Sequence, residues 1–81
     1  MADTQKIVLS IIGNYTNSAK VSAKSKLSEL HIGPLDAESI RLDLEDEFDV
    51  VIGAGASIEW KKCKQIIVSV NRAINGKANR N

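Results

Sequence analysis

The sequence predicts an all-α protein: a small bundle of three main helices and one short helical turn, with a long loop between the first two helices. Three observations predict this class. Apolar residues recur at the three- and four-residue spacing of amphipathic helices in three separate segments. Polar residues dominate the stretch between the first two segments. No two segments alternate apolar and polar residues as paired strands would. With 81 residues the chain forms one domain.

The first helix is expected from Asp3 to about Tyr15. Its apolar stripe consists of Ile7, Val8, Ile11, Ile12 and Tyr15. Asp3 or Thr4 can cap its start, because a short polar side chain accepts hydrogen bonds from the free N–H groups of the first turn.

A pinned loop is expected from Gly13 to Gly33. Its composition shifts to Ser, Asn, Lys and Thr, with isolated apolar anchors at Val21, Leu27, Leu30 and Ile32. Loops of this length are uncommon in small domains, so this one either contains a short turn of helix or serves a function.

The second helix is expected to begin at Gly33-Pro34, because proline suits the first turn, where its missing N–H would have no partner. Carboxylates in that turn complement the helix dipole. The predicted apolar stripe is Leu35, Ile40, Leu44 and Phe48, with Leu42 to one side, and carboxylates fill most of the remaining positions. This pattern predicts an amphipathic helix with an acidic outer face.

The last third is expected to hold a docking segment, a turn and a helix. Val50-Val51-Ile52 docks on the core, since no alternating partner strand exists for it. Gly53-Ala54-Gly55 forms a joint, and Ala56 to Trp60 form one helical turn. A last helix is predicted from about Lys61 to Ile74, with Gly76 as its stop. The helical domain then covers residues 1–76, and residues 77–81 form a frayed basic tail.

Charge is distributed unevenly although the net charge is only +1. Seven of the ten carboxylates lie close together, whereas the chain from Trp60 onward carries only positive charge. The acidic block is Asp36, Glu38, Asp43, Glu45, Asp46, Glu47 and Asp49, relieved by Arg41. The basic residues lack interleaved aromatics, so nucleic acid is not the expected partner. Pairing with the acidic helix, or solvation, is expected instead.

Other sequence features narrow the class of protein. The single cysteine, Cys63, excludes an internal disulfide, and the amino terminus lacks a secretory layout. No apolar run is long enough to span a bilayer. His31 has no cysteine or second histidine near it, so no metal site is expected. We therefore predict a soluble, monomeric cytoplasmic protein that is not an enzyme, since no set of acid, base and nucleophile can be assembled.

The segment from Leu30 to Ile52, LHIGPLDAESIRLDLEDEFDVVI, resembles the central part of acyl carrier proteins, whose usual pattern is close to LGxDSLDxxELxxxLEEEFxxxI. The match is ungapped. It includes Leu30, Leu35, Asp36, Ile40, Leu44, Glu45, Glu47, Phe48 and Ile52. The length of the chain and the spacing of its apolar residues also resemble those of the family over nearly the whole sequence. The resemblance therefore implies the helical bundle of acyl carrier proteins.

In that family, the serine of the DSL triplet carries a 4′-phosphopantetheine arm. Here the triplet reads Gly33-Pro34-Leu35. Pro34 has no hydroxyl to attack the phosphorus of coenzyme A, so no cofactor is expected on the sequence as it stands. Proline preserves the helix start, so the substitution removes chemistry while keeping the local fold. Ser28 and Ser39 are the alternative hydroxyls, and Ser39 lies more than one turn into the helix.

The resemblance also implies binding residues. Partner enzymes of the family dock their basic patches on the second helix, and the predicted docking residues are Asp36, Glu38, Glu45, Asp46, Glu47 and Asp49. Ser39 and Asp43 depart from the usual residues there. The residues expected to line an acyl pocket are Leu27, Leu44, Phe48, Ile52, Trp60 and Ile67. Trp60 stands where the family has an aliphatic side chain, so it either narrows the pocket or caps the core.

Three functions remain open. The first is a carrier-like docking protein of fatty-acid or other acyl-chain metabolism that cannot be phosphopantetheinylated. The second is a working carrier of a specialised acyl or peptidyl pathway, modified at another serine or with a non-native residue at position 34. The third is a structural or nucleic-acid-binding helical protein whose likeness to carriers is convergent.

Overall fold

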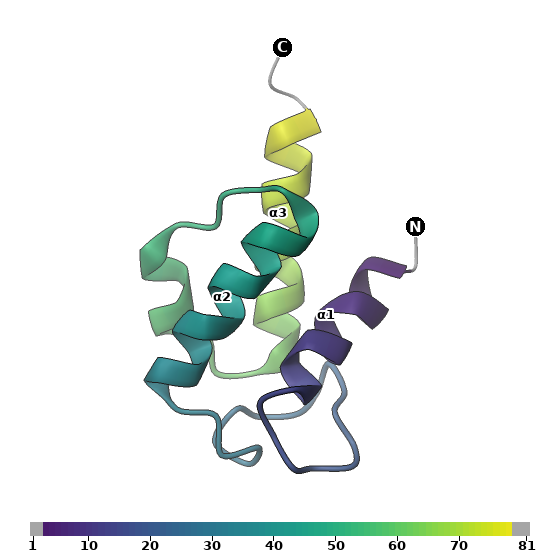
Figure 1. Ribbon diagram of the computed structural model, residues 1–81, viewed down its shortest axis with the longest axis vertical. Helices are drawn as coiled ribbons and strands as arrows, with labels where there is room; N and C mark the ends of the chain where they lie inside the picture. Colours follow the sequence, from purple (N-terminus) through teal and green to yellow (C-terminus); the bar gives the residue numbers. More distant parts are fainter. Residues whose placement is uncertain (1–2, 79–81) are drawn as a thin grey trace.

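The computed structural model describes residues 3–78, which form three α-helices and one 3₁₀ helix (Figure 1). The helices are α1 (Asp3–Gly13), α2 (Pro34–Phe48), η1 (Ala54–Glu59) and α3 (Cys63–Ala78). Between residues 3 and 78 there is no strand, only an isolated antiparallel bridge from Lys26 to Lys62. The prediction of a small all-α bundle with a short extra helical turn and a long first connection is confirmed.

Helix α1 buries one face and ends earlier than predicted. Val8 and Ile12 are fully buried in the core. The helix ends at Gly13. Tyr15 lies in the turn that follows, and its backbone N–H donates to the Ile12 carbonyl at 2.9 Å. Asp3 and Thr4 lie inside the helix, so neither occupies the cap position, which falls outside the described residues.

Helix α2 begins at Pro34, as expected, with Gly33 in an extended conformation before it. It ends where Asp49 adopts a left-handed conformation, φ 53° and ψ 51°, and donates its N–H to the Glu45 carbonyl. The prediction that Leu35 belongs to the apolar stripe is wrong, because its side chain is 85% exposed. The buried face runs through Ala37, and Leu35 lies about 200° around the helix from that residue.

The segment after α2 docks on the core and leads into η1. Val50 and Ile52 are buried while Val51 is exposed, so the alternation anchors the segment without a partner strand. The predicted helical turn at 56–60 is present as η1, two residues earlier at its start. Trp60 follows it, buried, with its Nε1 donating to Ser69 Oγ at 2.9 Å.

Helix α3 runs past the predicted stop. It begins at Cys63 instead of Lys61 and continues through Gly76 to Ala78. Gly76 has no positive φ and occupies an ordinary helical position, so it does not end the helix. The Lys77 ammonium holds this last turn against the end of α2, since Nζ lies 2.7 Å from the Asp49 carbonyl and 2.8 Å from Asp49 Oδ2. The remainder of the predicted tail, residues 79–81, lies outside the described residues.

The core forms where the three α-helices meet the first loop. α1 packs on both α2 and α3, and η1 packs on α2. The loop contributes three buried side chains, Leu27, Leu30 and Ile32, and contains hydrogen-bonded turns without a helix. It is fixed to the start of α3 by bonds from Cys63 N to the Ser25 carbonyl and from Lys64 N to the Ala23 carbonyl, both 2.9 Å.

Candidate functional site

The first residue of α2 borders a hollow of about 620 Å³. Pro34 is exposed at its edge. The walls come from loop residues 26–28, the start of α2, η1 and residues 60–62. The apolar part of the lining includes Leu27, Ile32, Ala37 and Trp60. Two stretches far apart in the sequence, residues 26–37 and 57–62, therefore meet beside the predicted attachment position.

Only two of the six predicted pocket residues line this hollow. Leu27 and Trp60 do so. Leu44 is fully buried, Ile52 and Ile67 are buried, and Phe48 is half-buried and packs against the core. These four residues fill the interior of the bundle instead of bordering the hollow at the start of α2.

The hydroxyl groups nearest in sequence to Pro34 differ in access. Ser28 is exposed and lines the hollow together with Pro34. Ser39 is half-buried on α2 and lies outside the lining. Ser57, which the sequence analysis did not single out, is buried and also lines the hollow; its Oγ donates to Glu38 Oε1 at 3.4 Å and lies 3.3 Å from the Ala54 carbonyl.

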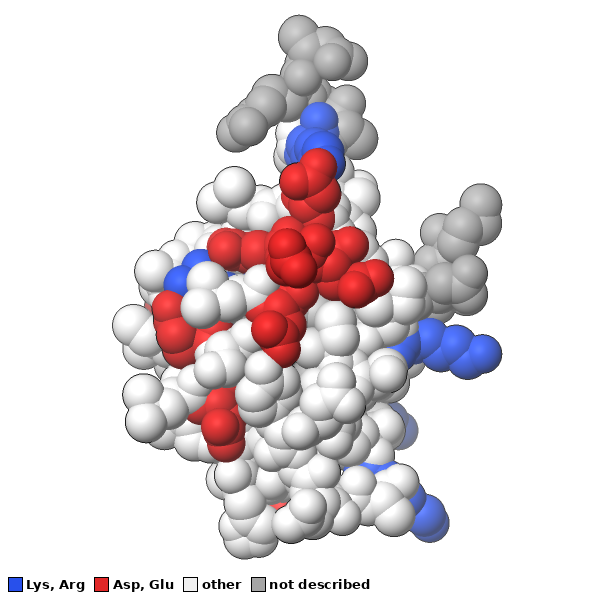
Figure 2. Space-filling view, in the orientation of Figure 1, with Lys and Arg blue, Asp and Glu red and all other residues white. Residues whose placement is uncertain are grey.

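Carboxylates gather on one face of the molecule, over α2 and the residue that follows it (Figure 2). The predicted docking residues fall into two groups. Asp46, Glu47 and Asp49 are exposed, as is Asp43, which was not predicted to dock. Asp36, Glu38 and Glu45 are only partly exposed. Asp43 also accepts a hydrogen bond from the Tyr15 hydroxyl, which ties the start of the long loop to α2.

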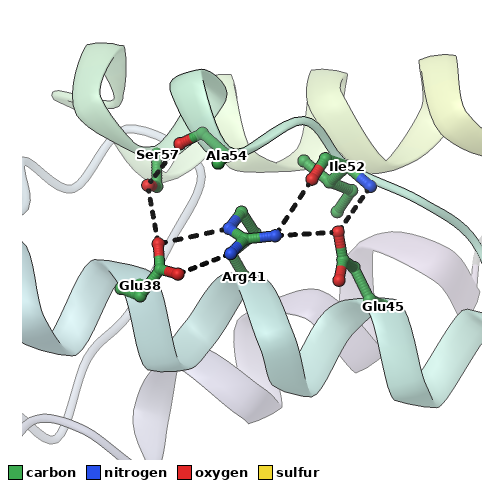
Figure 3. A network of polar contacts seen from close by, with 6 residues as sticks. All are labelled: Glu38, Arg41, Glu45, Ile52, Ala54 and Ser57. Atoms are coloured by element: carbon green, nitrogen blue, oxygen red, sulfur yellow. Dashed lines mark hydrogen bonds and ion pairs between the residues drawn. The ribbon is translucent and has the colours of Figure 1, made fainter.

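Two of the partly exposed carboxylates belong to a polar network around Arg41, a residue that is only 9% exposed (Figure 3). Arg41 Nε lies 3.2 Å from Glu38 Oε1, and Nη2 lies 2.5 Å from Glu38 Oε2. Nη1 donates to Glu45 Oε2 at 2.9 Å and to the Ile52 carbonyl at 3.1 Å. Glu45 Oε2 also accepts the Ile52 N–H at 2.7 Å. The network therefore joins α2 to the segment that follows it.

This network was missed at the sequence level, where Arg41 appeared only as a relief of negative charge. The signal was present in the spacing, because Glu38 and Glu45 stand three residues before and four residues after Arg41, on one side of a helix. The bonds to Ile52 were not visible, since they depend on the path of the chain after α2.

Hydrogen bonding and burial shift several pKa values. The bond from Arg41 lowers the pKa of the Glu38 carboxyl, and the bond from Lys77 lowers the pKa of Asp49. Both groups stay ionised at neutral pH. The bond to Asp43 raises the pKa of the Tyr15 hydroxyl. Burial raises the pKa of the Cys63 thiol, which disfavours the reactive thiolate.

Within residues 3–78 no three His, Cys, Asp or Glu side chains are placed to hold a metal ion. In the same range, none of the helices has the length and apolar character needed to cross a membrane. Comparison of the chain with models of known protein families, with curated proteins and with solved structures finds no significant match.

Proposed function

We propose that this chain is a docking protein of the acyl-carrier type, which offers the acidic face of α2 to enzymes of acyl-chain metabolism and carries no covalent arm at Pro34. The observation that carries the proposal is that α2 holds both an exposed proline at its first position and exposed carboxylates. Pro34 is exposed at the first position of α2, beside a hollow, and the exposed carboxylates Asp43, Asp46 and Glu47 lie on the carboxyl-terminal part of that helix. The ungapped resemblance from Leu30 to Ile52 supports it.

The exposed carboxylates suit a basic partner surface. Asp46 and Glu47 are exposed, and neither forms an ion pair with another described side chain. Clustered charge of one sign accelerates and selects encounters with a partner of opposite sign, and salt weakens the effect. Glu45 is a poorer docking contact, since Arg41 and the Ile52 N–H already occupy its Oε2.

Charge reversal tests the docking proposal. We expect Asp46→Lys with Glu47→Lys to raise the Kd for a carrier-dependent acyltransferase by about tenfold or more, and to flatten its salt dependence. The matched control is Glu29→Lys with Glu59→Lys, which changes the net charge equally at exposed positions outside α2. Unchanged affinity in the α2 variant, or equal losses in both, would count against docking through α2.

Intact mass tests the attachment position. The chain and a Pro34→Ser variant are incubated with coenzyme A and a broad-specificity phosphopantetheinyl transferase. The serine oxygen attacks the phosphorus, adenosine 3′,5′-bisphosphate leaves and the hydroxyl proton passes to base. We expect a mass gain in the variant alone. A gain in neither chain would contradict a carrier-type recognition surface.

The second candidate function is a working carrier modified at Ser28. One observation favours it, because Ser28 is exposed and lines the hollow that Pro34 borders. A mass gain in the natural chain, lost in Ser28→Ala and retained in Ser39→Ala, would establish this function in place of the first.

A further inference from the structure

The hollow beside Pro34 has a positively charged side. Lys26, Lys61 and Lys62 line it, and no carboxylate belongs to the lining among residues 3–78. None of the three lysines forms an ion pair with a carboxylate in that range. Two carboxylates contact lining residues without lining the hollow themselves: Glu29 Oε1 accepts from the backbone N of Lys26 at 3.3 Å, and Glu38 Oε1 accepts from Ser57 Oγ at 3.4 Å.

The backbone holds two of these lysines directly opposite each other. Lys26 and Lys62 form the isolated antiparallel bridge. The flanking bonds, Leu27 N to the Lys61 carbonyl and Cys63 N to the Ser25 carbonyl, are both 2.9 Å. In this arrangement the opposed residues form the non-hydrogen-bonded type of pair, whose side chains share one face and lie close together. Like charges placed this way destabilise the fold, and a bound anion would remove the repulsion.

Part of the lining of the hollow is apolar and accessible. Ile58 on η1 is 83% exposed although it is a large aliphatic residue. Trp60, which is buried, also belongs to the lining, and its Nε1 donates to Ser69 Oγ at 2.9 Å. A volume of about 620 Å³ lies within the range of about 300–1,000 Å³ that is usual for small-molecule sites.

We propose that this hollow binds a free fatty acid without a covalent link, with the carboxylate between Lys26 and Lys62 and the hydrocarbon chain against Ile58 and Trp60. The unpaired lysines and the apolar residues of the same lining match the two ends of such a molecule. This inference goes beyond the docking function, because it requires neither a partner enzyme nor an arm at Pro34.

Trp60 provides the direct measurement, since it is the only tryptophan in the chain. Sodium dodecanoate is titrated below its micelle concentration while tryptophan fluorescence is recorded, with calorimetry for stoichiometry. We expect saturable binding of one molecule per chain. Dodecanol, which lacks the charge, and dodecyltrimethylammonium, which reverses it, should bind at least about tenfold more weakly. The absence of a saturable response to dodecanoate, or equal binding of the cationic amphiphile, overturns the proposal.

Variants test the placement of the two ends. Lys26→Ala with Lys62→Ala should weaken dodecanoate binding by about tenfold or more, while the charge-matched control Lys6→Ala with Lys20→Ala should bind within about twofold of the natural chain. Ile58→Ser should also weaken binding. The lysine variant should melt at or above the temperature of the natural chain, because it removes a repulsion. An unchanged affinity in the lysine variant excludes the assigned carboxylate position.

Vesicles separate a free fatty acid from a membrane surface. The protein is floated with vesicles of phosphatidylcholine containing phosphatidylglycerol. Flotation without a dodecanoate response would assign the lysines to a membrane surface and overturn the proposal. Because the lysine variant leaves the carboxylates of α2 in place, its binding to the acyltransferase should be unchanged, so failure of this inference and failure of the docking proposal give different results.

Discussion

Arg41 shows at the scale of one residue how a charge can be buried without leaving a polar group unpaired. Its guanidinium donates to two carboxylates and to the Ile52 carbonyl. No buried side-chain polar atom within residues 3–78 lacks a partner. The planar fork of arginine allows these bonds in several directions at once, whereas the ammonium of lysine is a compact point charge. The network should therefore require arginine itself and not only a positive charge.

The conservative substitution Arg41→Lys tests this requirement. We expect the melting temperature to fall by about 5 °C or more, because Lys cannot reach Glu38, Glu45 and Ile52 together and a partly exposed carboxylate of the network loses its partner. Thermal unfolding followed by circular dichroism measures the change. Arg72→Lys, at an exposed position on α3, is the control and should melt within about 1 °C of the natural chain. A variant at position 41 as stable as the natural chain would show that the network adds nothing specific to arginine.

The same network gives stability a defined dependence on pH. The folded pKa of Glu38 is lowered by Arg41, so the folded chain binds its proton less readily than the unfolded chain does. The stabilisation is therefore fully present above the unfolded pKa of about 4.3 and is lost as the pH falls through the folded value. The bond from Lys77 likewise lowers the folded pKa of Asp49, so this carboxyl also contributes stability that is lost as the pH falls. Urea unfolding between pH 7 and pH 3 should show this loss, and it should be smaller in Arg41→Met, which lacks the partner of Glu38. Equal pH dependence in the two chains would contradict the assignment.

At the scale of the helix, sequence periodicity located every element but not its contacts. The three α-helices and η1 each overlap the segment predicted from the apolar spacing and the turn residues, with ends shifted by up to four residues, because amphipathic spacing has to match the face that the helix buries. Leu35 was wrongly assigned to the buried face, because Leu35 and Ala37 are both apolar and the sequence alone does not show which of the two points toward the core. Neighbouring Ala37, a small residue with a weak hydropathic signal, defines that face.

The candidate site was predicted less completely than the fold for a related reason. Pro34 and the carboxylates of α2 are contiguous in sequence, so their presence on one helix could be predicted. The opposition of Lys26 and Lys62 could not, because it depends on how the long loop returns to the start of α3. The basic residues of the last third were therefore predicted only to be solvated or to pair with the acidic helix, although Lys61 and Lys62 line the hollow.

Gly76 provides a test of the corrected end of α3. It lies within the helix at an exposed position, and a Cβ there would meet no atom within 4 Å. Gly76→Ala should raise the free energy of unfolding by up to about 0.5–1 kcal/mol, since alanine loses less backbone freedom in a helix. Gly53→Ala, outside the α-helices, serves as the comparison and also meets open space. Urea unfolding measures both, and a loss of stability in Gly76→Ala would indicate that the helix ends before this residue.

At the scale of the whole molecule, negative and positive surfaces occupy different ends of α2. The exposed carboxylates Asp46, Glu47 and Asp49 lie at its carboxyl end, whereas the lysine-lined hollow lies at its start. The ion pair of Lys77 with Asp49 joins the last turn of α3 to the end of α2. This separation leaves the two proposed binding surfaces free to act independently.

The integrity of the bundle as a unit can be measured through Cys63, the only cysteine in the chain. Its thiol is fully buried at the start of α3, and its backbone N–H is bonded to the Ser25 carbonyl. Burial raises its pKa, so both access and thiolate formation are suppressed in the folded chain.

We expect a disulfide-forming aromatic reagent at pH 8 to label the folded protein about 10³-fold or more slowly than the urea-unfolded chain. The labelling rate should rise with low concentrations of urea with the slope of global unfolding, because exposing Cys63 requires α1, α3 and the long loop to separate. A rate that is slow but independent of urea would mean instead that the first turn of α3 opens locally from the loop, and the lysine pair across that junction would then be held less rigidly than the fatty-acid site requires.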